Sequence, residues 1–220
     1  MKRVPQFELL DHDQGTPEEI AASLHDLRTI NRNFGGIATT RRMLQNAMQS
    51  ASLKRASVLE VAAGDGFAID QAVRKLPSSL AVDLTLLDRR GSHGSNGNDA
   101  TITGDALHLP FSDSSFDFIS CGLFVHHLAP HDVVRFVSEA LRVARHALLI
   151  NDLVRSRIHL ALVYFGFPLF RSRITYHDAP ASVRQAYTVS ELRDLLRQAS
   201  PARLEISRVF LYRMAAIAWK

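Results

Sequence analysis

The sequence predicts an α/β fold: a mostly parallel sheet of seven strands, with helices on both faces and an antiparallel pair at its C-terminal end. Apolar runs of strand length alternate with helix-length segments between residues 58 and 150, as in parallel sheets with right-handed crossovers. The last two apolar runs, 204–210 and 214–219, are separated by only three residues. So short a connection closes a hairpin and cannot make a crossover, so this final pair must be antiparallel.

Composition favours a single domain. The 220 residues are 46% hydrophobic and 22% charged, which suffices for one sizeable core and not for two. The net charge is +4, but the arginines are scattered and form no stripe interleaved with aromatic residues. We therefore expect no nucleic-acid partner, and a modest attraction to anionic surfaces or acidic ligands remains open.

Cysteine usage and targeting signals indicate the compartment. The single cysteine, Cys121, excludes an internal disulfide and fits a reducing environment. The N-terminal residues lack the apolar region of a signal peptide. The longest apolar stretch, residues 158–170, is too short to span a bilayer and contains Gly166 and Pro168. These features predict a soluble, cytoplasmic protein.

Two helices are expected before the first strand. Residues 1–15 are polar and mixed, which predicts a loose arm. Thr16 has the pattern of an N-cap, with Pro17 at the first helical position and Glu19 completing a capping box. The chain breaks at Gly35-Gly36, and a second helix follows to about residue 53. Because both helices precede the sheet, we expect residues 1–54 to form a helical cap, within the same domain, over a sheet edge or the mouth of the site.

The first strand and the turn after it organise the chain. Residues 58–61 are an apolar run with one carboxylate, Glu60, which suits a parallel strand buried on both faces. Residues 62–66, Ala-Ala-Gly-Asp-Gly, have almost no side-chain volume, so the backbone can turn tightly and approach a ligand. A helix follows from Phe67 until Pro77 stops it. This arrangement favours a nucleotide-type site, and the alternative is an ordinary strand–helix turn.

Polar and small residues follow the other predicted strands. Strand 81–87 ends at Asp88, 22 residues after Gly66, where nucleotide-binding α/β folds place a carboxylate that binds the ribose hydroxyls. A flexible surface loop is expected at residues 91–98, and helices after Pro130 and Thr188. The remaining parallel strands are 101–103, 116–121 and 147–150. Their shared rim gathers residues that favour a ligand site: Gly64, Asp88, Asp105, Cys121, His126, His127 and Asp152.

The order of motifs resembles one family. A dinucleotide dehydrogenase is disfavoured, since Ile69 stands where a third glycine should follow Gly64 and Gly66. The series VLEVAAGDG, LTLLD, GDALHLPFSDSSFDFISC and LFVHHL, with a terminal antiparallel pair, resembles the class I S-adenosylmethionine-dependent methyltransferases. It looks most like the branch acting on quinones, phenols and other small or lipid-like acceptors. The likeness implies a Rossmann-like methyltransferase domain at residues 55–220 that binds S-adenosylmethionine.

The resemblance extends to the cofactor-binding positions. Glu60 matches the acid that orients the methionine ammonium, and Asp88 matches the acid that binds the ribose. Asp105 and Ala106 match the pair that contacts adenine, with turn capping as the alternative for Asp105. Cys121 matches a backbone position beside the methionine part, or simply packs in the core. The full set of expected cofactor contacts is Glu60, Ala62, Ala63, Gly64, Gly66, Asp88, Arg89, Asp105, Ala106 and Cys121.

Two of these positions leave alternatives open. Ala62 stands where the family usually has glycine, and its methyl group requires a slightly different path of the loop without excluding binding. Arg89 could lie over the adenine ring or be solvated.

Histidines are the candidate catalytic groups. Methyl transfer is an in-line displacement, so catalysis can rest on orienting and desolvating the nucleophile. An oxygen acceptor also needs its proton removed, and either His126 or His127 could be the base, with at most one facing the cavity. His177, beside Asp178, is a further candidate or part of a surface turn. We expect O-methylation rather than C-methylation, and no metal.

An irregular insertion at about residues 153–187 concerns the acceptor. Its aromatic run is expected to roof the cavity as a channel for a small hydrophobic or phenolic acceptor; the alternatives are a helix packed on the core and a dimer contact. Arginines flank the run and could hold an anionic substituent or rest against a membrane surface, a possible peripheral membrane contact. The run is Tyr164, Phe165, Phe167, Leu169 and Phe170, and the arginines are Arg155, Arg157, Arg171 and Arg173.

Two other classes of function are considered. A non-catalytic S-adenosylmethionine-binding protein would keep the cofactor residues and transfer no methyl group. A protein or nucleic-acid methyltransferase would need an exposed acceptor groove. The nucleic-acid reading is disfavoured, because residues 121–124 read Cys-Gly-Leu-Phe in place of the Asp/Asn-Pro-Pro-aromatic motif of many such enzymes.

Overall fold

The computed structural model describes residues 1–89 and 100–220, and its centre is a seven-stranded sheet in the order β3-β2-β1-β4-β5-β7-β6. Strands β1 to β5 pair in parallel, and β7 is antiparallel to both β5 and β6, which confirms the predicted fold class with its terminal hairpin. The loop expected at residues 91–98 lies outside the described residues. The strands are β1 (Arg55–Val61), β2 (Ala81–Asp88), β3 (Ala100–Thr103), β4 (Phe116–Gly122), β5 (Ala144–Leu153), β6 (Arg203–Val209) and β7 (Arg213–Trp219).

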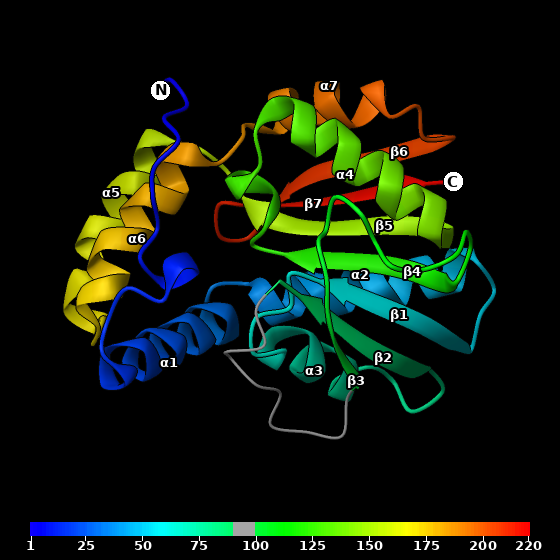
Figure 1. Ribbon diagram of the computed structural model, residues 1–220, viewed down its shortest axis with the longest axis horizontal. Coiled ribbons are helices and arrows are strands. Elements are labelled where there is room, and N and C mark those ends of the chain that lie inside the picture. The colour runs from blue at the N-terminus through cyan, green and yellow to red at the C-terminus, as the bar shows by residue number, and fades with distance from the viewer. Residues whose placement is uncertain (90–99) are drawn as a thin grey trace.

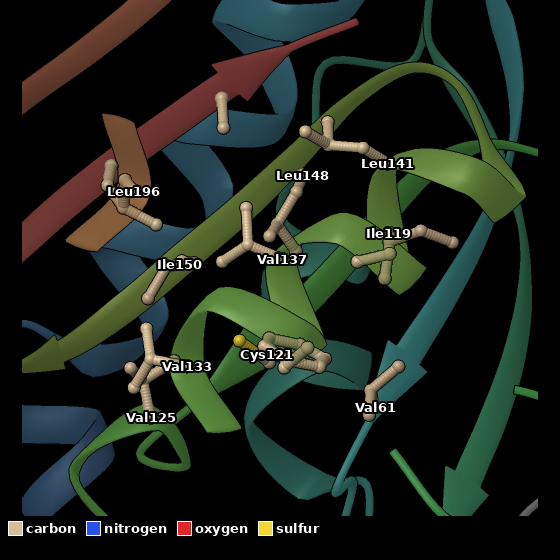
Figure 2. Packing of buried hydrophobic residues seen from close by; sticks show 14 of the residues in the cluster. Val61, Ile119, Cys121, Val125, Val133, Val137, Leu141, Leu148, Ile150 and Leu196 are labelled. Atoms are coloured by element: carbon tan, nitrogen blue, oxygen red, sulfur yellow. The ribbon is translucent and has the colours of Figure 1, made fainter. Parts of the chain in front are cut away.

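Helices cover both faces of the sheet (Figure 1). Helices α2 (Gly36–Ser50) and α3 (Phe67–Arg74) pack on one face, where their apolar side chains join those of β1 and β5 in one core cluster. Helices α4 (Pro130–Val143) and α7 (Val189–Gln198) pack on the other face over a larger cluster, part of which Figure 2 shows. Burial on both faces explains why the central strands read as continuous apolar runs.

Three more helices form a cap at the end of the sheet where the parallel strands finish. They are α1 (Pro17–Asn33), α5 (Arg157–Phe165) and α6 (Arg173–Gln185), and Figure 1 shows them side by side. The capping box predicted for α1 is present: the Thr16 hydroxyl accepts from the Glu19 N–H, and the Glu19 carboxylate accepts from the Thr16 N–H. The expectation of an irregular insertion was wrong, because Ser156 and Ser172 each cap a helix within it.

Arg213 ties this cap to the sheet. Its side chain is buried, and its guanidinium donates to the Phe34 carbonyl at 3.1 Å, to Asn31 at 3.0 Å and to Asn151 at 3.3 Å. Asn151 lies in β5, so three elements meet at one cation. Asn151 also donates to the carbonyl of Gly36 at 2.9 Å, at the start of α2.

The N-terminal segment is not the loose arm that its composition suggested. The carboxylate of Asp178 in α6 accepts from the N–H groups of Leu9 and Leu10, at 2.8 and 2.9 Å. Arg3 donates to the carbonyls of Gln185, His126 and Leu128. Polar side chains that look solvated in a linear reading therefore hold residues 3–12 across the cap, and Figure 1 shows this stretch running beside α6.

Helix length limits how the chain can meet a bilayer. Among the residues that the structure describes, no helix is long and apolar enough to cross a membrane.

Candidate active site

Two adjoining cavities lie between the cap and the sheet. The larger, of about 650 Å³, opens over the carboxyl ends of β1, β2 and β4. The smaller, of about 240 Å³, lies under α5 and α6. The two cavities share part of their walls: Glu8, Leu10, Asp11, Leu27, Leu123, His127 and Arg213.

The turn after β1 forms the floor of the larger cavity. Ala62 has a φ of 55°, a left-handed conformation that residues other than glycine, asparagine and aspartate seldom adopt. The turn therefore holds an alanine in a conformation that glycine adopts without strain. A side chain at Gly64 would meet no atom within 4 Å, so this backbone faces open space where a ligand can approach.

Glu60 lines the larger cavity, and its carboxylate is in an unusual state. It is buried, and its Oε2 atom has no hydrogen-bond partner among the described residues. Burial raises its pKa to about 7, against the opposing effect of hydrogen bonds from Ser120 and the Gly122 N–H. An unsatisfied buried acceptor is costly unless a ligand completes it, so the site fits a group that brings a cation or a hydrogen-bond donor to this atom.

The remaining acidic positions lie along the same cavity. The Asp88 carboxylate accepts from the Gly64 N–H at 2.8 Å, which ties the end of β2 to the turn. Asp105 caps its own turn by accepting from the Leu107 N–H at 2.9 Å, so the capping alternative holds whether or not a ligand binds there. Eight of the ten expected cofactor contacts line the larger cavity: Glu60, Ala62, Ala63, Gly64, Asp88, Arg89, Asp105 and Ala106.

Gly66 and Cys121 do not line it. Gly66 has a φ of 69°, a left-handed conformation that favours glycine, and a side chain there would also approach Leu86 Cδ1 to 2.6 Å. Cys121 is 1% exposed, and its side chain belongs to the same core cluster as Val125 and Val133 (Figure 2). The residue after it, Gly122, lines the cavity in its place.

Apolar side chains make up more than half of the wall of the smaller cavity, to which α1, α5 and α6 contribute, and α6 adds the polar Thr175, Asp178 and Ser182. Of the predicted aromatic run, only Leu169 and Phe170 line it. Leu162 and Val163 of α5 and Ala179 of α6 complete the apolar wall. The outward-facing members of the run are a separate feature, considered below.

The expectation that at most one of the adjacent histidines faces the cavity was wrong, because both line the smaller cavity, where they take different partners. His126 is buried, and its Nδ1 lies 2.6 Å from Asp152 Oδ1. Burial alone would raise the pKa of Asp152, but His126 outweighs it and the pKa is lowered, so Asp152 is a carboxylate that accepts from a protonated Nδ1. The other ring nitrogen, Nε2, lies 3.8 Å from Glu8 Oε1, and the residue lines the smaller cavity.

His127 lines both cavities, with its Nδ1 2.9 Å from Asp11 Oδ2. Burial alone would lower its pKa, but the carboxylates of Asp11 and Glu8 raise it to about 9. It is therefore an imidazolium near neutral pH. His177 lies elsewhere: it is exposed, pairs with Asp178 at 2.8 Å and lines neither cavity.

Glu8, His126 and His127 offer atoms within 4.8 Å of one another, a spacing that a metal ion could use. Each is already engaged within the protein, however. Glu8 accepts from Ser182 at 2.7 Å and from Gln185 at 2.5 Å, and the histidines face Asp152 and Asp11. We interpret the cluster as a hydrogen-bond network around the cavity.

Several wall residues were missed by sequence analysis. Glu8 and Asp11 come from the arm that was expected to be loose, and Arg28 and Asn31 come from α1. Arg28 pairs with Asp65 of the turn at 2.7 Å, so α1 closes directly over the first motif. An available signal was the position of Asn31, which follows Leu24 by seven residues and Leu27 by four and so falls within the apolar stripe of α1.

Comparison with known proteins agrees with this geometry. Residues 59–147 match the family described as "Methyltransferase domain". Demethylmenaquinone methyltransferase of Thermobifida fusca is 34% identical over 94 residues, covering 40% of this chain and 39% of the relative. The enzyme of the same name from Roseiflexus castenholzii is 30% identical over 158 residues, covering 64% and 66%. The chain thus spans less than two thirds of either relative's length.

Solved structures share the fold. A plantazolicin methyltransferase in complex with SAH superposes with a TM-score of 0.70 at 15% identity, covering 96% of this chain and 93% of the other. A SAM-dependent methyltransferase from Aquifex aeolicus gives a TM-score of 0.55 at 18% identity, covering 80% and 88%.

The strain at Ala62 can be measured. Ala62→Gly removes a left-handed penalty of about 1–2 kcal/mol and adds about 0.5–1 kcal/mol of chain entropy in the unfolded state. We expect its free energy of unfolding, from urea titration, to rise by about 0.5–1 kcal/mol. Ala63→Gly, next in the chain and not left-handed, is the control and should only lose stability. Equal losses in both variants would contradict a left-handed Ala62.

Proposed function

We propose that this chain, which belongs to the class I S-adenosylmethionine-dependent methyltransferases, transfers a methyl group to a small hydrophobic, phenolic acceptor. The observation that carries the acceptor assignment is the pair of cavities. A polar cavity over the carboxyl ends of the strands adjoins an apolar cavity, and His127 lies in the wall of both. The names of the two curated relatives specify a demethylated quinone, which is an acceptor of this general class.

The larger cavity would hold the cofactor. Glu60 Oε2 would accept from the methionine ammonium, and the turn at Gly64 would lie against the methionine part. Asp88 would bind the ribose hydroxyls, and Asp105 and Ala106 would contact the adenine. When bound, S-adenosylmethionine supplies an electrophilic methyl group on a sulfonium whose positive charge disappears in the transition state.

The smaller cavity would hold the acceptor. Its apolar wall would bury a ring or an alkyl chain and exclude water, which desolvates the attacking oxygen. The cap supplies most of this wall, so we propose that residues 1–54 and the helices within 153–187 serve as the acceptor side. Residues 55–220 would be the methyltransferase domain, which contains the helices within 153–187 and packs with residues 1–54 as one domain.

His126 and His127 would have different roles. Asp152 holds His126 in the tautomer with a proton on Nδ1, which leaves Nε2 to take the proton of an acceptor hydroxyl as it attacks. His127, as an imidazolium, would donate a hydrogen bond to the acceptor oxygen and orient it. His177 has no part in this proposal, because it lines neither cavity.

Methyl transfer to an alkylphenol tests the function. The protein is incubated with S-adenosylmethionine labelled in the methyl group, and O-methylated product is expected. Val163→Trp or Ala179→Trp, which fill the smaller cavity, should raise the KM for the acceptor by about tenfold or more and leave cofactor binding intact. Ala161→Trp, on the exposed side of α5, is the matched control. Label transferred only to peptides or RNA, or calorimetry in which NAD binds and S-adenosylmethionine does not, would overturn the proposal.

Glu60 predicts a pH dependence of cofactor binding. Only the carboxylate can pair with the ammonium, so a pKa of about 7 should make affinity about tenfold weaker at pH 6 than at pH 8, measured by calorimetry. Glu60→Gln should bind more weakly at pH 8 and lose this dependence. Any pH dependence that the variant retains belongs to another group.

The same substitution should stabilise the unliganded protein. The folded state holds the Glu60 proton more tightly than the unfolded chain, so this group's contribution to stability falls as pH rises from about 4.5 to about 7. At pH 8, Glu60→Gln should therefore raise the free energy of unfolding by up to about 3 kcal/mol. A destabilised Glu60→Gln variant at pH 8 would contradict the buried, unpartnered carboxylate.

Substitution of His126 tests its proposed role as the general base. His126→Gln should lower kcat toward a phenol by about 10²–10⁴-fold, the range for loss of a general base. The loss should be much smaller with an acceptor whose hydroxyl is already ionised, such as a nitrophenol. His177→Gln is the control and should leave kcat unchanged. If His126→Gln retains full activity toward both acceptors, His126 is not the base.

A further inference from the structure

Helix α5 and the short helix η4 (Phe167–Leu169) expose large apolar side chains, and three of them, Ile158, Leu162 and Phe165, share one face of α5 by their spacing. Phe165 is 85% exposed, Leu169 68% and Ile158 62%. Large apolar residues on soluble proteins are normally scattered singly, and a cluster of this kind marks an interaction site. We name it the α5–η4 surface: Ile158, Leu162, Tyr164, Phe165 and Leu169.

Positive charge surrounds this surface. Residues 153–177 contain no aspartate or glutamate. Arg157 and Arg171 are exposed at its two ends, and their side chains form no ion pair with any described residue. The other two arginines of the segment are neutralised, Arg155 by Glu191 at 2.5 Å and Arg173 by Glu19 at 2.8 Å.

The α5–η4 surface is also one side of a thin wall. Leu162 and Leu169 belong to it and also line the smaller cavity. These two side chains are thus partly exposed and also part of the wall of the proposed acceptor site. An apolar molecule lying against the surface would therefore be one side-chain layer away from that cavity.

We propose that the α5–η4 surface docks on an anionic lipid bilayer, from which a lipid-like acceptor reaches the smaller cavity. The second half of this proposal rests on the proposed function. Helix α5 has nine residues, too few to span a bilayer, so it would lie in the interface with Phe165 and Ile158 among the acyl chains and the arginines at the phosphates. A second copy is a poorer occupant, since a symmetric contact would bring the arginines of both copies together.

Vesicle co-sedimentation of the whole protein, without cofactor or acceptor, tests the docking. Phosphatidylcholine vesicles containing phosphatidylglycerol should bind the protein, and pure phosphatidylcholine should bind it much more weakly. Ile158→Ser with Phe165→Ser, neither of which lines a cavity, should weaken binding by more than about tenfold. Arg157→Glu with Arg171→Glu should do the same, and added salt should weaken the wild type.

The matched control is Arg193→Glu with Arg197→Glu on α7, which makes the same change in net charge and should shift binding by only about twofold. Thermal melts confirm that each variant is folded. Equal binding by the wild type and both surface variants would overturn the proposal. So would absence of vesicle binding in a protein that dimerises through the α5–η4 surface.

Activity measurements distinguish docking from catalysis. Ile158→Ser with Phe165→Ser should retain kcat toward a short, water-soluble phenol and lose at least about tenfold activity toward an alkylphenol embedded in anionic vesicles. Equal activity toward the embedded acceptor would overturn the access route. A wild type that binds vesicles and methylates neither phenol would leave the docking supported and defeat the proposed function.

Discussion

The buried guanidinium of Arg213 holds the helical cap on the sheet, and both cavities exist because the cap sits there. A cation of this kind is stable only while its acceptors stay in place, since burial lowers its pKa to about 10 and leaves it charged. Those acceptors come from the end of α1, the chain just after it and β5. One side chain of the C-terminal hairpin therefore holds the end of α1 on the sheet, and the Arg28–Asp65 pair joins the same helix to the first turn.

Patterns along the chain predicted the sheet and most of the larger cavity. Continuous apolar runs predict parallel strands that are buried on both faces. The small residues from 62 to 66 predict a tight turn, and the short link before β7 predicts an antiparallel hairpin. Because parallel strands end on a common rim, Glu60, Asp88 and Asp105 could be placed together without any knowledge of contacts. Cys121 shows the limit of that reasoning: alternation along β4 turns its side chain to the core and presents the next residue to the cavity.

The acceptor side could not be predicted in the same way, because its order comes from contacts between distant segments. The N–H groups of Leu9 and Leu10 donate to Asp178, which is far along the chain. No pattern in residues 1–15 predicts this contact. Helix α5 was misread for a different reason. A helix with one apolar side toward a cavity and another toward the exterior has no polar face, so the 3.6-residue period that identifies surface helices is missing.

The arm has a thermodynamic consequence for the two proposed ligands. Glu8, Leu10 and Asp11 stand in the walls of both cavities. Asp178 and Arg3 already hold this segment, so the conformational entropy of ordering it is lost on folding and not on binding. An arm that was open for part of the time would weaken the binding of both ligands by the same factor, because each needs the same closed wall.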